Sequence, residues 1–214
     1  MNNVARRIWR IVRWPLAVIF LLFVGLVIYR IPVVEERMKT EEVVKKIHAQ
    51  KIMLADVLGQ NLPPEPDSLL KDATIEGIDA NGNGIRDDVE LAIFKLHPDS
   101  ARIRAAELQY AMALQDEMTK DVFNQETLVA VLQEKSRASL CVTDTGPKVN
   151  RSDSDETINK ALAVTDTRKQ EVENLVSNTD QRRARRQEIR ERYMTSYGDI
   201  AGPECDIDLI SLPN

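Results

Sequence analysis

Apolar residues form one long run near the beginning of the chain. From Trp14 to Tyr29 the sequence WPLAVIFLLFVGLVIY carries no charge, and further apolar residues lie on both sides of it. A helix that crosses a bilayer needs roughly 20 mostly apolar residues, and terminal arginines can extend their charged ends toward the interfaces. Residues 1–34 are therefore predicted to be a short basic segment followed by a transmembrane signal anchor.

Beyond the anchor, apolar residues recur at helical spacings. Between residues 44 and 58 they are separated by three, four or seven positions, which predicts an amphipathic juxtamembrane helix over 35–60. The stretch NLPPEPDS, residues 61–68, should break this helix, because prolines lack a backbone donor and push the preceding residue into extended geometry. Residues 69–214 would then form a separate helical domain.

Apolar residues within 69–214 also recur at helical spacings. No stretch long enough to form a strand alternates between apolar and polar residues. Turn-forming residues mark a loop over 143–153. The predicted helices span 87–96, 99–118 and 124–141, and residues 154–178 and 179–198 are expected to form either one broken helix or two. The expected fold class is all-α, with a single N-terminal transmembrane helix followed by a helical bundle that one loop interrupts.

The charges are divided unequally between the two parts. The chain has 29 Lys and Arg against 34 Asp and Glu. Residues 1–34 hold five of the arginines and no acid, so every acid lies in the remainder. Under the positive-inside rule the N-terminus stays in the cytoplasm and the acidic part is exported. We therefore expect a single-pass protein of the inner (plasma) membrane with a periplasmic or extracytoplasmic domain.

Two alternatives to the anchor stay open. A cleaved signal peptide shares the basic start and the apolar stretch but requires small residues at the cleavage site. The residues from Ile28 to Pro32 do not supply such a site. The other alternative is a buried helix of a soluble protein.

The chain has two cysteines, Cys141 and Cys205. In an exported protein an even pair is expected to form a disulfide, here joining the end of a predicted helix to the C-terminal segment. The alternative is two buried thiols. No CxxC or Cys/His spacing indicates a zinc site.

The most specific motif is DANGNGIRDDVE, residues 79–90, which matches D-x-[DN]-x-[DN]-G-x5-E at every defined position. Ca²⁺ prefers six to eight oxygen ligands, and a loop of this pattern can supply them from positions 1, 3, 5, 7, 9 and 12. Gly84 occupies position 6, where the sharp turn favours a positive φ. The predicted ligands are Asp79, Asn81, Asn83, the carbonyl of Ile85, Asp87 and Glu90.

The segment NGNGIRDDVE resembles the calcium loops of EF-hand-like proteins and thrombospondin type 3 repeats, and residues 77–90 resemble a loop of bacterial envelope proteins. The resemblance implies Ca²⁺ as the bound ion. It departs from the EF-hand pattern because position 7 is Ile85 and position 8 is Arg86, which puts pairing with a second loop in doubt. With few carboxylates, we expect an affinity of roughly 10⁻⁴ to 10⁻³ M. The alternative is an Asn/Gly-rich turn without an ion.

Other charged residues give weaker signals. A run of arginines is predicted to be a solvated helix face paired with acids, with an anionic lipid or an acidic partner as the alternative and no role in nucleic-acid binding. We expect His48 and His97 to lie at the surface or to cap helices. These arginines are Arg182, Arg183, Arg185, Arg186, Arg190 and Arg192.

We found no catalytic motif such as HExxH, G-x-S-x-G or a phosphate loop. The leading hypothesis is therefore a membrane-anchored, calcium-binding envelope protein that is not an enzyme and serves as a structural or protein-interaction module with a protein partner. One alternative is a calcium-dependent enzyme with a site around Tyr110, Glu107 and the first-turn acids. Another is a sensory or assembly subunit whose anchor packs against a second membrane protein.

Overall fold

The protein is all-helical in the part that the computed structural model describes, namely residues 3–198, 200 and 202–213. No strand is present in those ranges, which confirms the predicted fold class at this level. The chain divides into two compact units, Met1–Glu42 and Val43–Asn214. Each unit is described by itself below.

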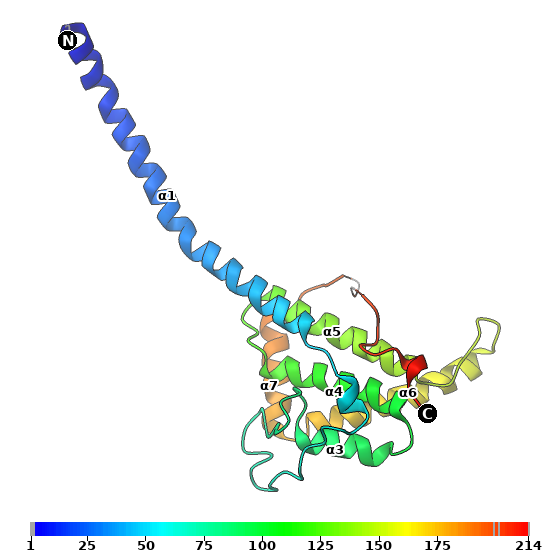
Figure 1. Ribbon diagram of the computed structural model, residues 1–214. Coiled ribbons are helices and arrows are strands. Elements are labelled where there is room, and N and C mark those ends of the chain that lie inside the picture. Colours follow the sequence, from blue (N-terminus) through cyan, green and yellow to red (C-terminus); the bar gives the residue numbers. More distant parts are fainter. Residues whose placement is uncertain (1–2, 199, 201, 214) are drawn as a thin grey trace. The chain divides into compact units, whose positions relative to one another are not determined.

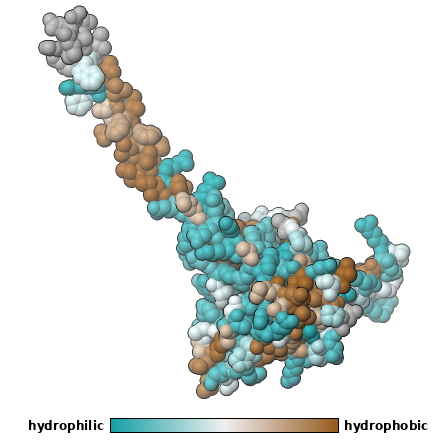
Figure 2. Space-filling view, viewed as in Figure 1, coloured by the Kyte–Doolittle hydropathy of each residue, from teal (hydrophilic) through white to brown (hydrophobic). Residues whose placement is uncertain are grey.

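The first unit consists of helix α1, which spans Asn3–Ala49 and continues into the second unit. The helix is long and apolar enough to cross a membrane near the N-terminus. Its apolar side chains point outward, for example Leu21, which is 68% exposed, and Figure 2 shows them as a brown surface along the helix. The side chains of Arg6, Arg7 and Arg10, which carry most of the predicted basic segment, lie outside the described part.

Helix α1 ends at Ala49, before the end of the predicted juxtamembrane helix over 35–60. A short helix α2 follows at Leu54–Val57. The interruption has a packing reason, because Ile47 is buried in one hydrophobic cluster and Ile52 in another. A continuous helix would not direct both side chains into their clusters. Residues 61–68 are non-helical, as the prolines predict, and they belong to the same compact unit as the helices after them.

The remaining helices of the second unit agree with the predicted positions, apart from the early end of the last long one (Figure 1). Polar side chains cap four of them: Ser100, Asn124, Ser154 and Thr179 each accept a backbone N–H three residues later. The helices are α3 (Asp87–Leu96), α4 (Ala101–Thr119), α5 (Gln125–Asp144), α6 (Asp155–Val176), α7 (Asp180–Tyr193) and the 3₁₀ helix η1 (Leu209–Ser211).

Helix α4 lies at the centre of this unit and packs against α3, α5, α6 and α7 (Figure 1). Leu108 and Leu114 on α4 are fully buried, and so are the carboxylate side chains of Glu107 and Glu117. A helix that is covered on all sides must bury some of its polar residues. Each buried charge then needs a partner from a neighbouring helix.

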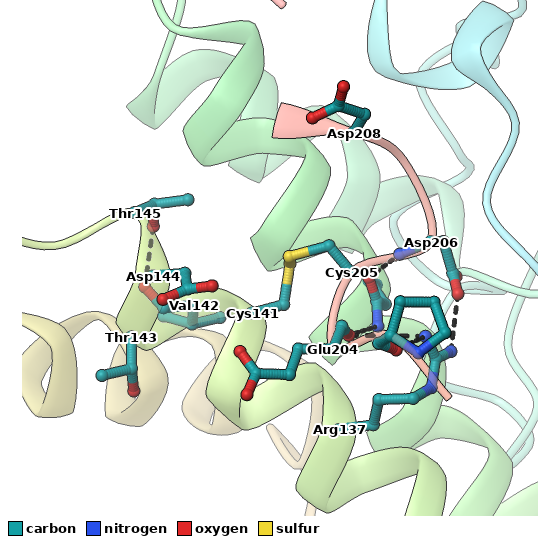
Figure 3. The surroundings of a disulfide bond; sticks show 12 residues. Arg137, Cys141, Val142, Thr143, Asp144, Thr145, Glu204, Cys205, Asp206 and Asp208 are labelled. Carbon is teal, nitrogen blue, oxygen red and sulfur yellow. Dashed lines mark hydrogen bonds and ion pairs between the residues drawn. A yellow bond between two sulfur atoms is a disulfide. The ribbon is translucent and has the colours of Figure 1, made fainter. Parts of the chain in front are cut away.

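The predicted disulfide between Cys141 and Cys205 is present, with the two Cα atoms 5.0 Å apart (Figure 3). It joins the last turns of α5 to the segment that leads to η1. The guanidinium of Arg137 donates to Asp206 at 2.5 Å and to the carbonyl of Pro203 at 3.0 Å. The C-terminal segment is therefore fixed to α5 by a covalent bond and by a buried ion pair.

Candidate metal centre

The predicted calcium loop runs into the first turn of α3, and both its base and its middle are held by contacts within the protein. The N–H of Asp87 donates to the carbonyl of Ile78 at 2.9 Å, which closes the base of the loop. The side chain of Ile85 is 1% exposed and belongs to the main hydrophobic core. The acids of the last part, Asp87 and Glu90, lie in the first turn of α3, where carboxylates interact favourably with the helix dipole.

Asp79 organises the first half of the loop. Its Oδ1 accepts the N–H of Gly82 at 2.8 Å, and its Oδ2 accepts the N–H of Gly84 at 2.9 Å. The two glycines have φ angles of 71° and 86°, a region in which residues with a Cβ are strained. The positive φ at Gly84 is the conformation that the motif predicts for its sixth position.

Asn81, Asn83 and Glu90 contact one another directly. The Nδ2 groups of the two asparagines donate to Oε2 of Glu90 at 2.9 and 3.0 Å. Three of the predicted ligand side chains therefore meet at one point, although positions 3, 5 and 12 are separated along the chain. In this arrangement the amide N–H groups face the carboxylate, and the amide oxygens accept backbone N–H groups, for example that of Ile85.

Two buried carboxylates in the loop are only partly satisfied. Asp87 is 1% exposed and Glu90 is fully buried. Oδ2 of Asp87 and Oε1 of Glu90 have no hydrogen-bond partner. Burial raises the pKa of Glu90 to about 7, although the bonds from the two asparagines oppose the shift. Burial also raises the pKa of Asp87, and the nearby charges of Asp79 and Asp88 add to this effect.

The described residues do not form a preassembled cluster of three or more His, Cys, Asp or Glu side chains in a metal-holding arrangement. Asp79 points to backbone N–H groups, and Asp87 accepts the N–H of Ala80 at 2.9 Å through Oδ1. The loop thus brings Asn81, Asn83 and Glu90 together, whereas Asp79 and Asp87 stabilise the backbone of the loop.

Arg86, at position 8 of the loop, is fully buried and connects the loop to the end of α6. Its guanidinium donates to the carbonyls of Val176 at 2.9 Å and Leu175 at 3.1 Å, and it forms two bonds with Asp88. The last carbonyls of a helix lack partners within the helix and attract cations. The residue that departs from the EF-hand pattern therefore fixes the loop through contacts within the chain.

Gln50 and Lys120 also border the loop, and the sequence did not indicate either. A Cβ on Gly84 would lie 2.2 Å from Nε2 of Gln50, so the amide of Gln50 packs directly against the loop. Oε1 of Gln50 accepts a hydrogen bond from Lys120, which also pairs with Asp116 at 3.5 Å. Because Gln50 directly follows α1, no local motif could have placed it beside a loop more than 30 residues later.

Of the residues named for the alternative enzyme site, the first-turn acids of α3 belong to the loop, whereas Tyr110 and Glu107 are buried on α4. Tyr110 is 3% exposed and donates to Glu173 at 2.7 Å. Glu107 is 1% exposed and pairs with Arg168 at 2.6 Å and with His97 at 3.0 Å. Their polar atoms are engaged within the protein, so this arrangement gives no support to a reaction at these residues.

The arginines of α7 pair with acids, as predicted, but they do not form a uniformly solvated face. Arg182 is fully buried and pairs with Asp72 at 2.5 Å. Arg186 and Arg190 bind Glu117 of α4. The periodic pattern of α7 did not reveal this, because the acids that pair with Arg182, Arg186 and Arg190 lie on other segments. His48, which is 39% exposed, contacts Glu134 at 2.8 Å and lies at the surface as expected.

No family model, curated protein or solved structure matches this chain.

Proposed function

We propose that this chain is a single-pass membrane protein whose helical unit lies outside the cytoplasm, binds Ca²⁺ in the loop from Asp79 to Glu90, and acts as a structural or protein-interaction module of the cell envelope. The ion would stabilise the loop and the start of α3. The observation that carries the proposal is the pair of buried carboxylates at Asp87 and Glu90, each with an oxygen that has no partner.

The chemistry of the loop supports a hard cation. Its side-chain ligand set consists of carboxylates and amides, with no Cys or His between residues 79 and 90. Oxygen ligands of this kind suit Ca²⁺ or Mg²⁺, whereas zinc and copper favour nitrogen and sulfur. The fixed backbone around Gly84 and the buried Ile85 would allow the loop to keep its shape when it takes up an ion.

The side chains of Asn81 and Asn83 can present either donors or acceptors to Glu90. In the structure their Nδ2 groups donate to Glu90 and partly offset its charge. An amide carries a donor and an acceptor, so rotating the side chain replaces N–H groups with oxygens. The three side chains could then turn oxygen atoms toward one cation. The negative charge of Glu90 would be balanced by the ion in place of two neutral donors.

Two features support the membrane topology. The arginines before residue 35 favour a cytoplasmic N-terminus under the positive-inside rule. The disulfide between Cys141 and Cys205 is typical of an oxidising compartment outside the cytoplasm. The interaction role rests on the exposed apolar side chains of the loop before the calcium site, above all Leu69 at 84% and Leu70 at 59%.

The calcium site is tested by thermal unfolding of the full chain in detergent micelles, with excess EDTA or with about 10 mM Ca²⁺, which is 10 to 100 times the expected dissociation constant. A ligand at 10 to 100 times its dissociation constant stabilises the folded state by roughly 1.4 to 2.7 kcal/mol, which should raise Tm by about 3 to 10 °C. Glu90→Gln removes the charged ligand and should abolish this rise.

Glu156→Gln is the control, because Glu156 is 77% exposed on α6 and lies outside the loop. It should keep the calcium-dependent rise of Tm. If calcium leaves Tm unchanged in the wild-type protein, or raises it equally in Glu90→Gln, the proposed site is wrong.

The topology is tested independently with an epitope tag on the C-terminus and protease added to sealed vesicles. The tag should be removed in right-side-out vesicles and protected in inside-out vesicles. The opposite pattern would place the helical unit in the cytoplasm.

A further inference from the structure

An open pocket of about 470 Å³ lies between α5, α7 and the residues just after α7. It is separate from the calcium loop, and its volume is within the range of small-molecule sites. The pocket combines two cationic side chains with an apolar wall. The lining includes Lys135 and Arg190 on the charged side and Leu132, Leu140, Met194 and Tyr197 on the apolar side.

The charged side belongs to a group of five ionised residues. Glu117, which is fully buried, pairs with Arg186 and Arg190. Lys135 is 3.5 Å from Glu173 and 4.0 Å from Glu117. The group contains three cations and two carboxylates, so its formal charge is +1. Binding of one monoanion would bring the formal charge of this group to zero.

Lys135 is the member with free donor capacity. A charge-assisted hydrogen bond between an ammonium and a carboxylate is typically about 2.7 to 2.9 Å long, and both ion pairs of Lys135 are longer. Its side chain is 19% exposed and lines the pocket. Burial lowers the pKa of Lys135, and the positive charges of Arg190 and Arg186 add to this effect, whereas Glu117 and Glu173 oppose it.

The apolar side surrounds the opening of the pocket. Leu140 is 41% exposed, Met194 50% and Tyr197 42%, and all three line the same pocket. Leu132, at 5% exposed, contributes to its interior. A ligand that fits both sides has a single negative charge at one end and an aliphatic chain at the other. The apolar side chains of Leu132, Leu140, Met194 and Tyr197 suit an alkyl chain better than a peptide backbone, whose amides would need more partners than Ser136 and Ser139 offer.

We propose that this pocket binds a small amphiphilic carboxylate of the medium-chain fatty-acid class. The carboxylate is held by Lys135 together with Arg190, and the alkyl chain lies against Leu140, Met194 and Tyr197. The site is independent of the calcium loop and of the membrane topology proposed above.

The test uses the full chain in nanodiscs of neutral phosphatidylcholine, with radiolabelled octanoate as the probe in equilibrium dialysis. Empty nanodiscs measure the amount that partitions into lipid. The protein should add saturable binding of one octanoate per chain. Octanol, which has the same alkyl chain without the charge, should compete at least about tenfold more weakly, since a hydrogen bond to a charged group is lost.

Two variants have closely matched controls. Lys135→Met removes the ammonium and should weaken binding by about tenfold or more. Lys169→Met is its control, because the side chain of Lys169 is also 19% exposed but lies on α6. Leu140→Glu places a negative charge at the opening and should abolish binding. Leu162→Glu is its control, because Leu162 is 42% exposed on α6.

Binding that is weakened by about tenfold or more in Lys135→Met and abolished in Leu140→Glu, with unchanged binding in both controls, supports the proposal. If Lys135→Met fails to fold, the exposed Leu140→Glu variant and its control decide the question. Absence of saturable binding, octanol binding as tight as octanoate binding, or equal binding by Leu140→Glu and Leu162→Glu would overturn it.

Discussion

Two regions of the helical unit bury carboxylates to the same extent and compensate them differently. Glu117 on α4 is fully buried and is bound by the guanidinium groups of Arg186 and Arg190. Glu90 on α3 is also fully buried, but its hydrogen bonds come from the neutral amides of Asn81 and Asn83. Burial alone therefore does not indicate a metal site. A better indication of a candidate metal site is a buried carboxylate that has no Lys, Arg or His of the protein as its partner.

The contrast extends to the neighbouring acids. Glu107 on α4 has Arg168 and His97 as partners, one on each carboxylate oxygen. Asp87 in the loop receives only the backbone N–H of Ala80 and keeps one oxygen without a partner. The α4 acids hold helices together through ion pairs, whereas Asp87 and Glu90 in the loop have no cationic partner from the protein and each keeps an oxygen without a hydrogen bond.

The largest loss of stability is expected when the ion pairs of Glu117 are removed. Glu117→Gln leaves two guanidinium groups and Lys135 close together without their shared carboxylate. Removing one partner from a buried ion pair typically costs about 3 to 5 kcal/mol. Urea unfolding of the full chain should show this loss of stability equally with calcium and with EDTA.

Glu156→Gln, on the exposed face of α6, should change the free energy of unfolding by less than about 0.5 kcal/mol. A Glu117→Gln variant as stable as this control would mean that the ion pairs of α4 contribute little. The comparison between the two regions would then lose its basis.

A smaller change in the free energy of unfolding is expected when the pH is varied, because the buried carboxylate of Glu90 has no cationic partner from the protein. The pKa of Glu90 is about 7 in the folded protein, above the value of 4.5 for an unperturbed glutamate. Its folded pKa is raised, so stability is greatest when Glu90 is protonated and falls as the pH rises through 7. In EDTA, the stability of the wild-type protein relative to Glu90→Gln should fall by up to about 2.5 kcal/mol from about pH 5 to about pH 8.

The comparison with Glu90→Gln is necessary because Asp116, whose pKa burial raises to about 6, titrates in the same interval in both proteins. Denaturant unfolding at several pH values measures the difference. A pH-independent difference between the two proteins would show that Glu90 is not an uncompensated buried carboxylate.

The smallest loss of stability is expected from two glycine substitutions, which distinguish backbone strain in the loop from the packing of Gln50 against it. Gly82 and Gly84 both have positive φ, so alanine at either position is strained by roughly 1 kcal/mol. A Cβ at Gly82 has no atom within 4 Å, whereas one at Gly84 meets the amide of Gln50. Gly84→Ala should therefore be less stable than Gly82→Ala by about a further 1 kcal/mol.

Unfolding in EDTA measures both variants, and Gly82→Ala serves as the control for backbone strain. Equal stabilities would mean that Gln50 does not constrain the loop. The contact between Gln50 and the loop over residues 79–90 would then have no energetic role.

The helices of the second unit could be predicted because their signals are local. Ser100, Asn124 and Thr179 precede amphipathic stretches and act as N-caps in the structure. The disulfide was predictable because the chain has only two cysteines. The end of α1 was not, because its cause is the burial of Ile47 and Ile52 in different clusters, a property of the tertiary packing.

The loop motif identified the residues that meet, but it did not identify what surrounds them. Asn81, Asn83 and Glu90 come together as the spacing indicates. Arg86 fixes the loop to α6 through carbonyls that are about 90 residues away, and Gln50 covers Gly84. These contacts join segments distant in sequence, so periodicity and motif spacing carry no information about them.

Proton release on calcium binding tests the central claim most directly. A folded Glu90 with a pKa of about 7 is mostly protonated near pH 6 and must lose its proton to bind the ion. Calorimetric titration in buffers of different ionisation enthalpy should show close to one proton released per Ca²⁺ near pH 6 and little near pH 8. Calcium binding without proton release at either pH, or no binding at all, would contradict the account.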